Sequence, residues 1–551
     1  MNRVSRIITQ NKSQGASQAM LYALGLTPLD IKKAHVGICS TWYEGNPSNV
    51  HLKSLSKKVK DGISDFYPNT LLGFRFNTVG AGGSLLMGTK GPLYSLPSRE
   101  IIADSLETTM NGQYYDANIS IAGGDSNIPG CLMGMIRINR PSIIIYGGNT
   151  TPGVYKGKDI NILDGFDSYR KMVNRKIDKE DREELLQKCY TGPGSSGYMD
   201  TANTMATATE AMGMMLPNGS SNMSVCIEKN KECYTRVVHA IFELMQKDIK
   251  PSDIITKRSL ENAITTMVAL GGSTNGVLHI LAIAKTAGID ITIDDFNRIR
   301  GNVSDLGDLK LSRKHVMYDI YKNGGTSTIL KHLLNKRLIH GDCMTVTGKT
   351  LEENLEKISL DNTHFLFNLE KKSSQIRIFK GNLAEDSAVG RITSSEEYFR
   401  GPARVFNHED DFIESLKNKG IEAGDVIIIR YQGPVGGPGM PEMLKSVSAI
   451  RDYDFSGKVA FLTDGRIFGN ISGFTIGHIS PEAHLAGRLA IVNNGDIIEI
   501  DAKKNTITLE VNDEEIEKRF TAWTIPKNNQ EGYLKKYTRL VSPASKGCVT
   551  C

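Results

Sequence analysis

The sequence is poor in cysteine. Eight cysteines are spread over 551 residues, which is typical of a reduced, cytoplasmic protein with buried thiols and not of a disulfide framework. Cys548 and Cys551 form a CxxC at the extreme C-terminus, but no second pair accompanies them. We therefore expect a frayed tail there and not a metal or redox site.

The sequence also lacks long apolar runs and an excess of one charge. Its longest apolar stretches, such as residues 142–146 and 426–429, are much shorter than the roughly 20 residues that cross a bilayer. Lys and Arg number 66 against 61 Asp and Glu, and they form no basic blocks. These features exclude a membrane protein and argue against nucleic acid or a membrane surface as the main partner.

The N-terminal segment has no acidic residue before Asp30. Arg3, Arg6 and Lys12 give residues 1–29 a faint likeness to an organellar presequence. Residues 19–24 followed by Gly25 instead fit a helix with a glycine cap. We expect a folded N-terminus and a cytoplasmic protein, and the organellar alternative stays open.

Apolar patterning indicates two domains. Up to about residue 370, short buried strands such as 35–39 and 142–146 alternate with helical patterns, which predicts an α/β domain over residues 1–370. The composition changes in the charged stretch 370–375. Beyond it, strand patterns at 426–431, 458–463 and 488–511 predict a smaller, mostly β domain over residues 374–551.

Glycine-rich segments form the most unusual feature of the chain. Glycine lets backbone N–H groups approach an anion closely, so several such loops indicate a pocket for a small carboxylate. None of these segments is a nucleotide-binding loop. Residues 348–350 have the ending of a phosphate-binding loop, but Cys343 occupies the position of the first glycine that such a loop needs. The segments are residues 80–91, 123–130, 191–205, 270–275, 433–443 and 463–483.

These segments also carry a resemblance to a known family. Read in order, they are similar to the dihydroxy-acid and sugar-acid dehydratases, hydro-lyases that turn a 2,3-dihydroxy acid into a 2-oxo acid. The chain is identified as a member of that family from about residue 20 to residue 544. The stretches are 94–100 (YSLPSRE), 201–205 (TANTM), 269–275 (ALGGSTN), 433–443 (GPVGGPGMPEM), 463–466 (TDGR) and 477–483 (GHISPEA).

The resemblance implies an architecture and a chemistry. It implies an N-terminal α/β domain, a smaller barrel-like, swivelling C-terminal domain, a site between them, and a homodimer as the basic unit. It further implies an iron–sulfur cluster that acts as a Lewis acid on the departing C3 hydroxyl. A Mg²⁺ ion would hold the substrate carboxylate and C2 oxygen, and a serine would take the C2 proton.

The chain departs from the family at the cluster ligands. The three positions that carry cysteine in the family are Ser48, Gly124 and Ser196 here. Iron–sulfur clusters need thiolates, which a serine hydroxyl or a glycine does not supply. Cys131 and Cys189 each lie seven residues from such a position, a spacing that suggests no replacement. We therefore expect no iron–sulfur cluster.

The magnesium ligands are changed as well. Asp125 and Glu442 match two of the family's carboxylates, whereas Gly83 and Ser126 stand where the family has an aspartate and a carbamylated lysine. Two carboxylates and water can hold Mg²⁺ only weakly. We expect at most weak Mg²⁺ binding.

The family's base is also missing. Its serine follows Gly-Arg-Phe, and Phe468 occupies that position here. Ser472 is a weak candidate to replace it, although a turn hydroxyl is the simpler interpretation. His51, His478 and His484 are further candidates for ligands or acids, but structural roles are the simpler interpretation for them too.

Three hypotheses follow. The favoured one is a catalytically silent member with a degenerate site, which acts as a binding or regulatory subunit, as a homodimer or higher oligomer, alone or with an active paralogue, or in a specialised pathway. The alternative is an active metal-dependent hydro-lyase that uses Asp125 and Glu442. The third is the family's own branched-chain amino-acid step or a sugar-acid dehydration.

Overall fold

A computed structural model describes residues 1–303, 316–360, 376–392, 397–467, 472–528 and 530–551. The chain has a mixed α/β fold with a closed C-terminal barrel, which confirms the expected fold class. The expected boundary at residues 370–374 lies outside the described residues. None of the helices in the described part of the chain is long and apolar enough to cross a membrane.

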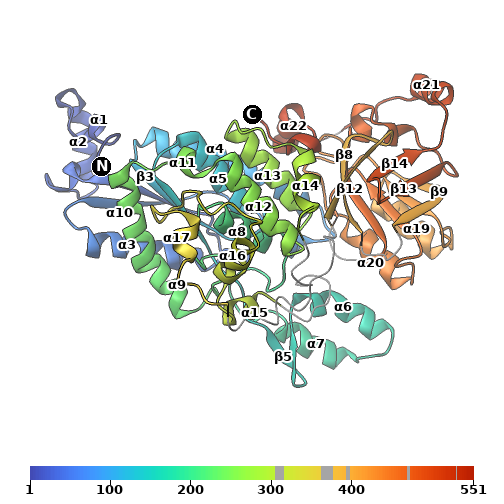
Figure 1. Cartoon of the computed structure of the whole chain (residues 1–551), viewed down its shortest axis with the longest axis horizontal. Helices are drawn as coiled ribbons and strands as arrows, with labels where there is room; N and C mark the ends of the chain where they lie inside the picture. The colour runs from blue at the N-terminus through green and yellow to red at the C-terminus, as the bar shows by residue number, and fades with distance from the viewer. Residues whose placement is uncertain (304–315, 361–375, 393–396, 468–471, 529) are drawn as a thin grey trace.

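The N-terminal half is built on a parallel sheet with the strand order β2-β1-β3-β4. Its central strand, β1, is buried along its whole length, as its apolar sequence predicts. A parallel sheet needs cover on both faces, and helices α3, α4, α5 and α10 supply it (Figure 1). The bounds are β1 Ala34–Ser40, β2 Leu71–Asn77, β3 Ala117–Ala122, β4 Ser142–Tyr146, α3 Leu52–Phe66, α4 Ser95–Gly112, α5 Asn127–Ile138 and α10 Val237–Lys247.

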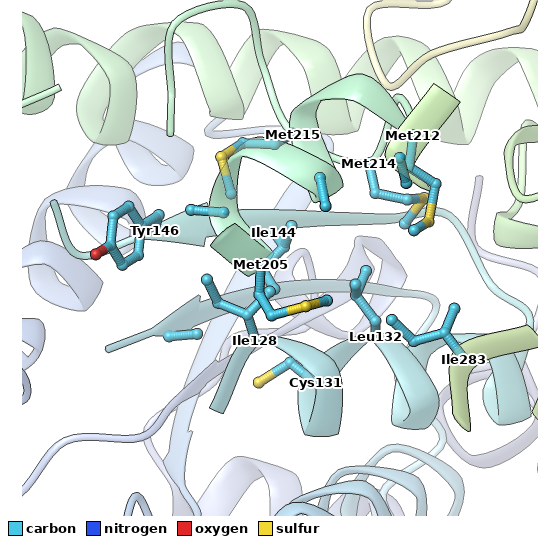
Figure 2. Close-up of a cluster of buried hydrophobic side chains, with 14 of the residues drawn as sticks. Ile128, Cys131, Leu132, Ile144, Tyr146, Met205, Met212, Met214, Met215 and Ile283 are labelled. Carbon is cyan, nitrogen blue, oxygen red and sulfur yellow. The ribbon is translucent and has the colours of Figure 1, made fainter. Parts of the chain in front are cut away.

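The core of this half lies between the sheet and helix α8, Thr201–Ala211. Figure 2 shows Leu132 of α5 close to Met205 of α8, with Met212 and Met214 above them. Methionine side chains fill irregular gaps between elements because they are unbranched and flexible. The core therefore fixes the start of α8, and with it the loop before that helix.

Of the further helices, α12, α13 and α16 pack against α8, whereas α1 and α2 lie at the N-terminal end of the molecule (Figure 1). A small hairpin unit projects from the body at the bottom of Figure 1. The hairpin unit comprises β5 Gly153–Tyr155, β6 Lys158–Ile160, α6 Ile162–Val173 and α7 Lys179–Lys188. The further helices are α1 Arg6–Thr9, α2 Gly15–Ala23, α9 Ile227–Lys231, α11 Pro251–Ile254, α12 Lys257–Ala269, α13 Asn275–Thr286, α14 Ile293–Arg300, α15 Met317–Lys322, α16 Thr326–Asn335 and α17 Leu351–Leu355.

The C-terminal half forms a barrel with the strand order β10-β11-β12-β8-β7-β14-β13-β9. The strands predicted near 426–431 and 458–463 are β10 and β11, whereas residues 488–491 form a 3-10 turn instead of a strand. The bounds are β7 Ile376–Gly381, β8 Ala384–Ile392, β9 Tyr398–Phe406, β10 Val426–Ile429, β11 Ala460–Thr463, β12 Phe474–Ser480, β13 Ile497–Asp501, β14 Thr506–Leu509, α19 Glu409–Lys417, α20 Leu444–Asp452, α21 Asp513–Ala522 and α22 Gly532–Leu540.

The C-terminal tail packs against helix α4, so the expectation of a frayed tail is wrong. Cys548 is fully buried, and only Cys551 is exposed. The Arg99 guanidinium, itself 0% exposed, donates to the carbonyl oxygens of Gly547 and Cys548 at 2.8 and 2.7 Å and pairs with Glu100 at 2.8 Å. A buried cation satisfied in this way ties the last residues of the chain to the first half.

We expect Arg99→Ala to lower the free energy of unfolding by about 3–5 kcal/mol, because the change removes the cation that pairs with the buried Glu100 carboxylate and leaves two carbonyls without their donor. Denaturant unfolding measures it. Lys535→Ala, on an exposed site of α22, serves as a control that changes stability by less than about 0.5 kcal/mol. A loss below about 1 kcal/mol for Arg99→Ala would contradict this account.

Candidate active site

A cavity of about 700 Å³ opens at the carboxyl ends of β1 and β3, where ligands bind in open parallel sheets. The loops after these strands form one wall, the loop before α8 forms a second, and α6 of the hairpin unit forms a third. The lining residues include Asn46, Pro47, Ser48, Val50, Gly82, Leu85, Gly124, Asp125, Ile162, Phe166, Tyr190, Ser196, Tyr198 and Asp200.

The three positions that carry cysteine in the family meet in this cavity. Ser48, Gly124 and Ser196 all line it. A Cβ atom placed on Gly124 would lie 3.8 Å from the Cβ of Ser48, an ordinary contact distance. The Ser196 hydroxyl donates a hydrogen bond to the Asp200 carboxylate. The family positions therefore remain together in space although their side chains differ.

Backbone pairing between loops holds this arrangement. The N–H of Gly194 donates to Pro47 O, and the N–H of Ser195 donates to Gly148 O, both at 2.9 Å. Gly148 has a φ of +94°, and a Cβ on it would lie 2.7 Å from Asn222 O. Only glycine fits a left-handed, crowded position of this kind. The loop that carries Ser196 is thereby fixed against the loop that carries Ser48.

Carboxylates dominate the electrostatics of the site. Burial, together with the nearby carboxylates of Asp200 and Glu442 and against the opposing charge of Arg466, raises the pKa of Asp125 to about 7. Glu442 lies on the barrel side, where the Arg466 guanidinium is 3.3 Å from its carboxylate and Asn275 donates to it. The cavity therefore has a negative potential that favours a proton or a cation.

Gly83 and Ser126, which replace the family's other two metal ligands, have these surroundings. Gly83 is buried, and a Cβ on it would lie 3.4 Å from the Ser95 hydroxyl. The buried Ser126 hydroxyl makes no hydrogen bond within the described structure. Within the same residues, no group of three or more His, Cys, Asp or Glu side chains is arranged to hold a metal ion. Mg²⁺ binding at Asp125 and Glu442 stays a prediction.

Of the two positions considered for the base, only Ser472 is among the described residues. Phe468 lies outside the described residues. Ser472 is exposed, and its carbonyl accepts from the Gly457 N–H in a turn, away from the residues that line the cavity. Its candidacy as a base gains no support from this position.

The surroundings of the three histidine candidates fit structural roles and not catalytic ones. The Nε2 atom of His51 lies 2.9 Å from Gly147 O, so the ring is hydrogen-bonded to the loop after β4. Burial, with a smaller contribution from the Arg466 charge, lowers the pKa of His478 to about 3. Burial also lowers the pKa of His484, which packs against Gly436. All three are favoured in the neutral state near pH 7.

The described side chains at the three family positions do not fit an iron–sulfur cluster. Two offer a hydroxyl and one offers no side chain, whereas the irons need thiolate ligands. Cys131 is fully buried in the core, and Cys189 lines a small adjoining pocket that shares Ser196 and Tyr190 with the cavity. No cysteine is among the described residues that line the cavity. We therefore route no reaction step through a cluster at these positions.

Comparison with known proteins defines the class of protein. Residues 33–354 match the model of the dihydroxy-acid/6-phosphogluconate dehydratase N-terminal domain, and residues 366–548 match that of the C-terminal domain. The chain belongs to this dehydratase family.

Individual relatives match over nearly the whole chain. The chain is 47% identical to the dihydroxy-acid dehydratase of Francisella tularensis subsp. novicida, covering 100% of this chain and 99% of the relative. It is also 47% identical to the dihydroxy-acid dehydratase of Flavobacterium psychrophilum. A third relative, the mitochondrial dihydroxy-acid dehydratase of Schizosaccharomyces pombe, is 48% identical and is covered to 93% of its length.

These matches correct the favoured hypothesis of a silent protein with a degenerate site. Relatives named dihydroxy-acid dehydratase match from end to end at 46–48% identity, which points to the alternative, an active enzyme. The error came from reading a few positions as decisive. The matches extend over the whole chain and not only over the few positions on which that hypothesis depended.

The expectation that the chain has no iron–sulfur cluster is contradicted by the same matches, because the dehydratase family it belongs to is, by the resemblance, a family of cluster enzymes. That expectation assumed that a cluster can be bound only through cysteines at these three positions. The geometry supports only the narrower statement that Ser48, Gly124 and Ser196 supply no thiolate.

Sequence reasoning missed Asp200 altogether. Its signal was available, because an aspartate directly before a helical pattern at residues 201–211 is a typical N-cap. The hydrogen bond from Ser196, four residues earlier, depends on the loop conformation and has no sequence signature.

We expect Asp125→Asn to stabilise the protein at pH 8 by a few kcal/mol, because one pKa unit corresponds to about 1.4 kcal/mol. The Asp125 pKa is about 7 in the folded state against an ordinary 3.8. Between these values the folded state binds more protons, so wild-type stability falls as pH rises. Denaturation from pH 4 to 8 should show the gain appear across this window and level off above it. An equal gain at pH 4 would contradict the assignment.

We expect Gly124→Cys to fold normally, with a free energy of unfolding within about 1 kcal/mol of wild type, because its Cβ has room beside Ser48. The matched variant Gly123→Ala places a Cβ 2.5 Å from Ser48 O and should lose about 1–3 kcal/mol. Thermal and denaturant unfolding compare the two. Equal stability of both variants would show that the loop around Ser48 is not held as described.

Proposed function

We propose that this protein is an active hydro-lyase that removes water from a 2,3-dihydroxy acid and releases a 2-oxo acid, in branched-chain amino-acid or related biosynthesis. The observation that carries the proposal is the end-to-end match to relatives named dihydroxy-acid dehydratase. The cavity supports it independently, since it gathers carboxylates at the carboxyl edge of the sheet.

The cavity suits a small acid with two hydroxyl groups and an aliphatic end. The carboxylates of Asp125 and Asp200 can accept hydrogen bonds from neighbouring hydroxyls. Ile162 and Phe166 of α6, together with Leu85, supply an apolar wall. Such a combination of a few polar groups and an apolar lining is typical of small-molecule sites.

Magnesium is the cofactor that the donor set fits. Oxygen ligands suit Mg²⁺, and a cation beside Asp125 would offset the burial and the carboxylate repulsion that raise its pKa. Asp125 would hold the ion, with Glu442 contributing from the barrel side. When bound, Mg²⁺ supplies a Lewis acid that polarises the oxygens of the substrate.

We further propose a homodimer as the working unit and a cytoplasmic location. The dimer is what membership of this family implies. Relatives from two fungi are named as mitochondrial proteins, so fractionation of the source cells would decide the location. Light scattering of the purified protein would decide the oligomeric state.

The function is tested by 2-oxo acid formation. Protein purified without oxygen, supplied with Mg²⁺ and with iron and sulfide, is incubated with a panel of 2,3-dihydroxy and sugar acids. We expect turnover on at least one short-chain 2,3-dihydroxy acid, with a loss of about 100-fold or more in Asp125→Asn. Folded protein that produces no 2-oxo acid from any acid on the panel would overturn the proposal.

A further inference from the structure

Met440 has a backbone conformation that is unusual for a bulky residue. Its φ is +50°, in the left-handed region that glycine adopts without cost, and its side chain is fully buried. It lies two residues before Glu442, the carboxylate of the barrel half that accepts from Asn275 of α13. Strain of this kind persists only where the surroundings fix it, and it is concentrated at functional sites. The turn at Met440 is therefore a candidate device for placing Glu442.

Backbone contacts hold this turn in place. The Met440 N–H donates to Gly437 O at 2.7 Å, and the Nε–H of Arg466 donates to Met440 O at 2.6 Å. Gly439, with a φ of +81°, runs so close to the α/β half that a Cβ atom on it would lie 1.8 Å from Leu93 O. The chain is therefore fixed both at Met440 and directly before it.

The side chain of Met440 is anchored by residues from other parts of the molecule. It belongs to a small buried cluster with Leu96 of α4, Leu278 of α13, and Ala544 and Cys548 of the C-terminal tail. The Sγ atom of Cys548 lies 3.9 Å from the Sδ atom of Met440. Methionine fills an irregular junction of this kind well, because it is unbranched and polarizable. The side chain thus fixes the barrel loop to the α/β half and to the tail.

Arg466 links this anchored turn to Glu442. The Arg466 N–H donates to Pro441 O at 3.0 Å, and Arg466 O accepts from the Met443 N–H at 2.9 Å, so the backbone on both sides of Glu442 is paired with Arg466. The guanidinium that contacts Met440 O also lies 3.3 Å from the Glu442 carboxylate. A shift of the turn would therefore move Arg466 and Glu442 together.

We propose that Met440 is a positioning residue for Glu442, and that its buried side-chain anchor sets the position of the Glu442 carboxylate at the junction of the two halves. The proposal rests on the proposed function, in which Glu442 contributes to Mg²⁺ binding. Met440→Gly would adopt the turn without strain but lose the anchor. Met440→Leu keeps about the same volume and with it the anchor. The two variants therefore separate the anchor from the backbone conformation.

The first measurement is the Mg²⁺ affinity of metal-free protein, by isothermal titration calorimetry. We expect the dissociation constant to rise about tenfold or more in Met440→Gly and to stay within about threefold of wild type in Met440→Leu, because groups that orient a metal ligand affect affinity on this scale. At saturating Mg²⁺, kcat should follow the same pattern. A role confined to packing would lower stability but leave both values of the folded protein unchanged.

Lys419→Gly is the matched control. Lys419 is exposed two residues after α19 ends and has a φ of +57°, so this change relieves the same kind of strain without removing a buried anchor. We expect its Mg²⁺ affinity and kcat to equal those of wild type. Cys548→Ala is a milder second variant that removes only the sulfur beside Met440. Should Met440→Gly not fold, Cys548→Ala decides, and we expect its Mg²⁺ affinity to fall about threefold or more.

The outcomes distinguish this inference from the proposed function. If wild type binds Mg²⁺ and forms product while folded Met440→Gly keeps both values within about threefold, the inference is overturned and the function stands. An equal loss in Met440→Leu and Met440→Gly would overturn it too, as would product formation by wild type without Mg²⁺ binding. If folded wild type neither binds Mg²⁺ nor forms product, the function itself is overturned, and the inference with it.

Discussion

Buried arginines hold the barrel against the α/β half, and the cavity depends on that junction. Arg391 of β8, which is 7% exposed, donates to the carbonyl oxygens of Gly271 and Gly272 at 2.7 and 2.6 Å. Asn275 of the α/β half donates to Glu442, whose charge Arg466 compensates from within the barrel half, and Arg99 fixes the C-terminal tail. A buried guanidinium is stable only when carbonyls or carboxylates satisfy it. These contacts therefore specify one docking position of the two halves, in which Glu442 approaches the cluster around Asp125.

The hairpin unit adds the third wall of the cavity and is tied to the same barrel. Arg451 of α20 pairs with Asp167 of α6 at 3.0 Å, and Arg170 of α6 lies 3.5 Å from Asp452 of α20. Helix α20 begins two residues after Glu442. The apolar wall from α6 and the carboxylate from the barrel are thus positioned through one helix, which couples the shape of the cavity to its charge.

The fold was largely predictable, whereas the site was predictable only in part. Short apolar strands alternating with helical patterns identify the buried strands β1 and β4, because burial on both faces leaves few alternatives. Ser48, Gly124 and Ser196 could be grouped by resemblance, and the structure does bring them together. The contact between Ser196 and Asp200 could not be predicted, since it depends on loop pairing through Gly194 and Ser195 and not on any periodicity.

The crowding of carboxylates also argues against the hypothesis that the residues of the site serve only to maintain the fold. Glycines such as Gly148 are required for folding whatever the chemistry, so their presence decides nothing. Asp125 is different, because burial beside Asp200 and Glu442 raises its pKa and costs stability above neutral pH. An asparagine there would remove that cost. A buried carboxylate cluster that opposes stability above neutral pH is typical of a functional site, which agrees with the proposed function.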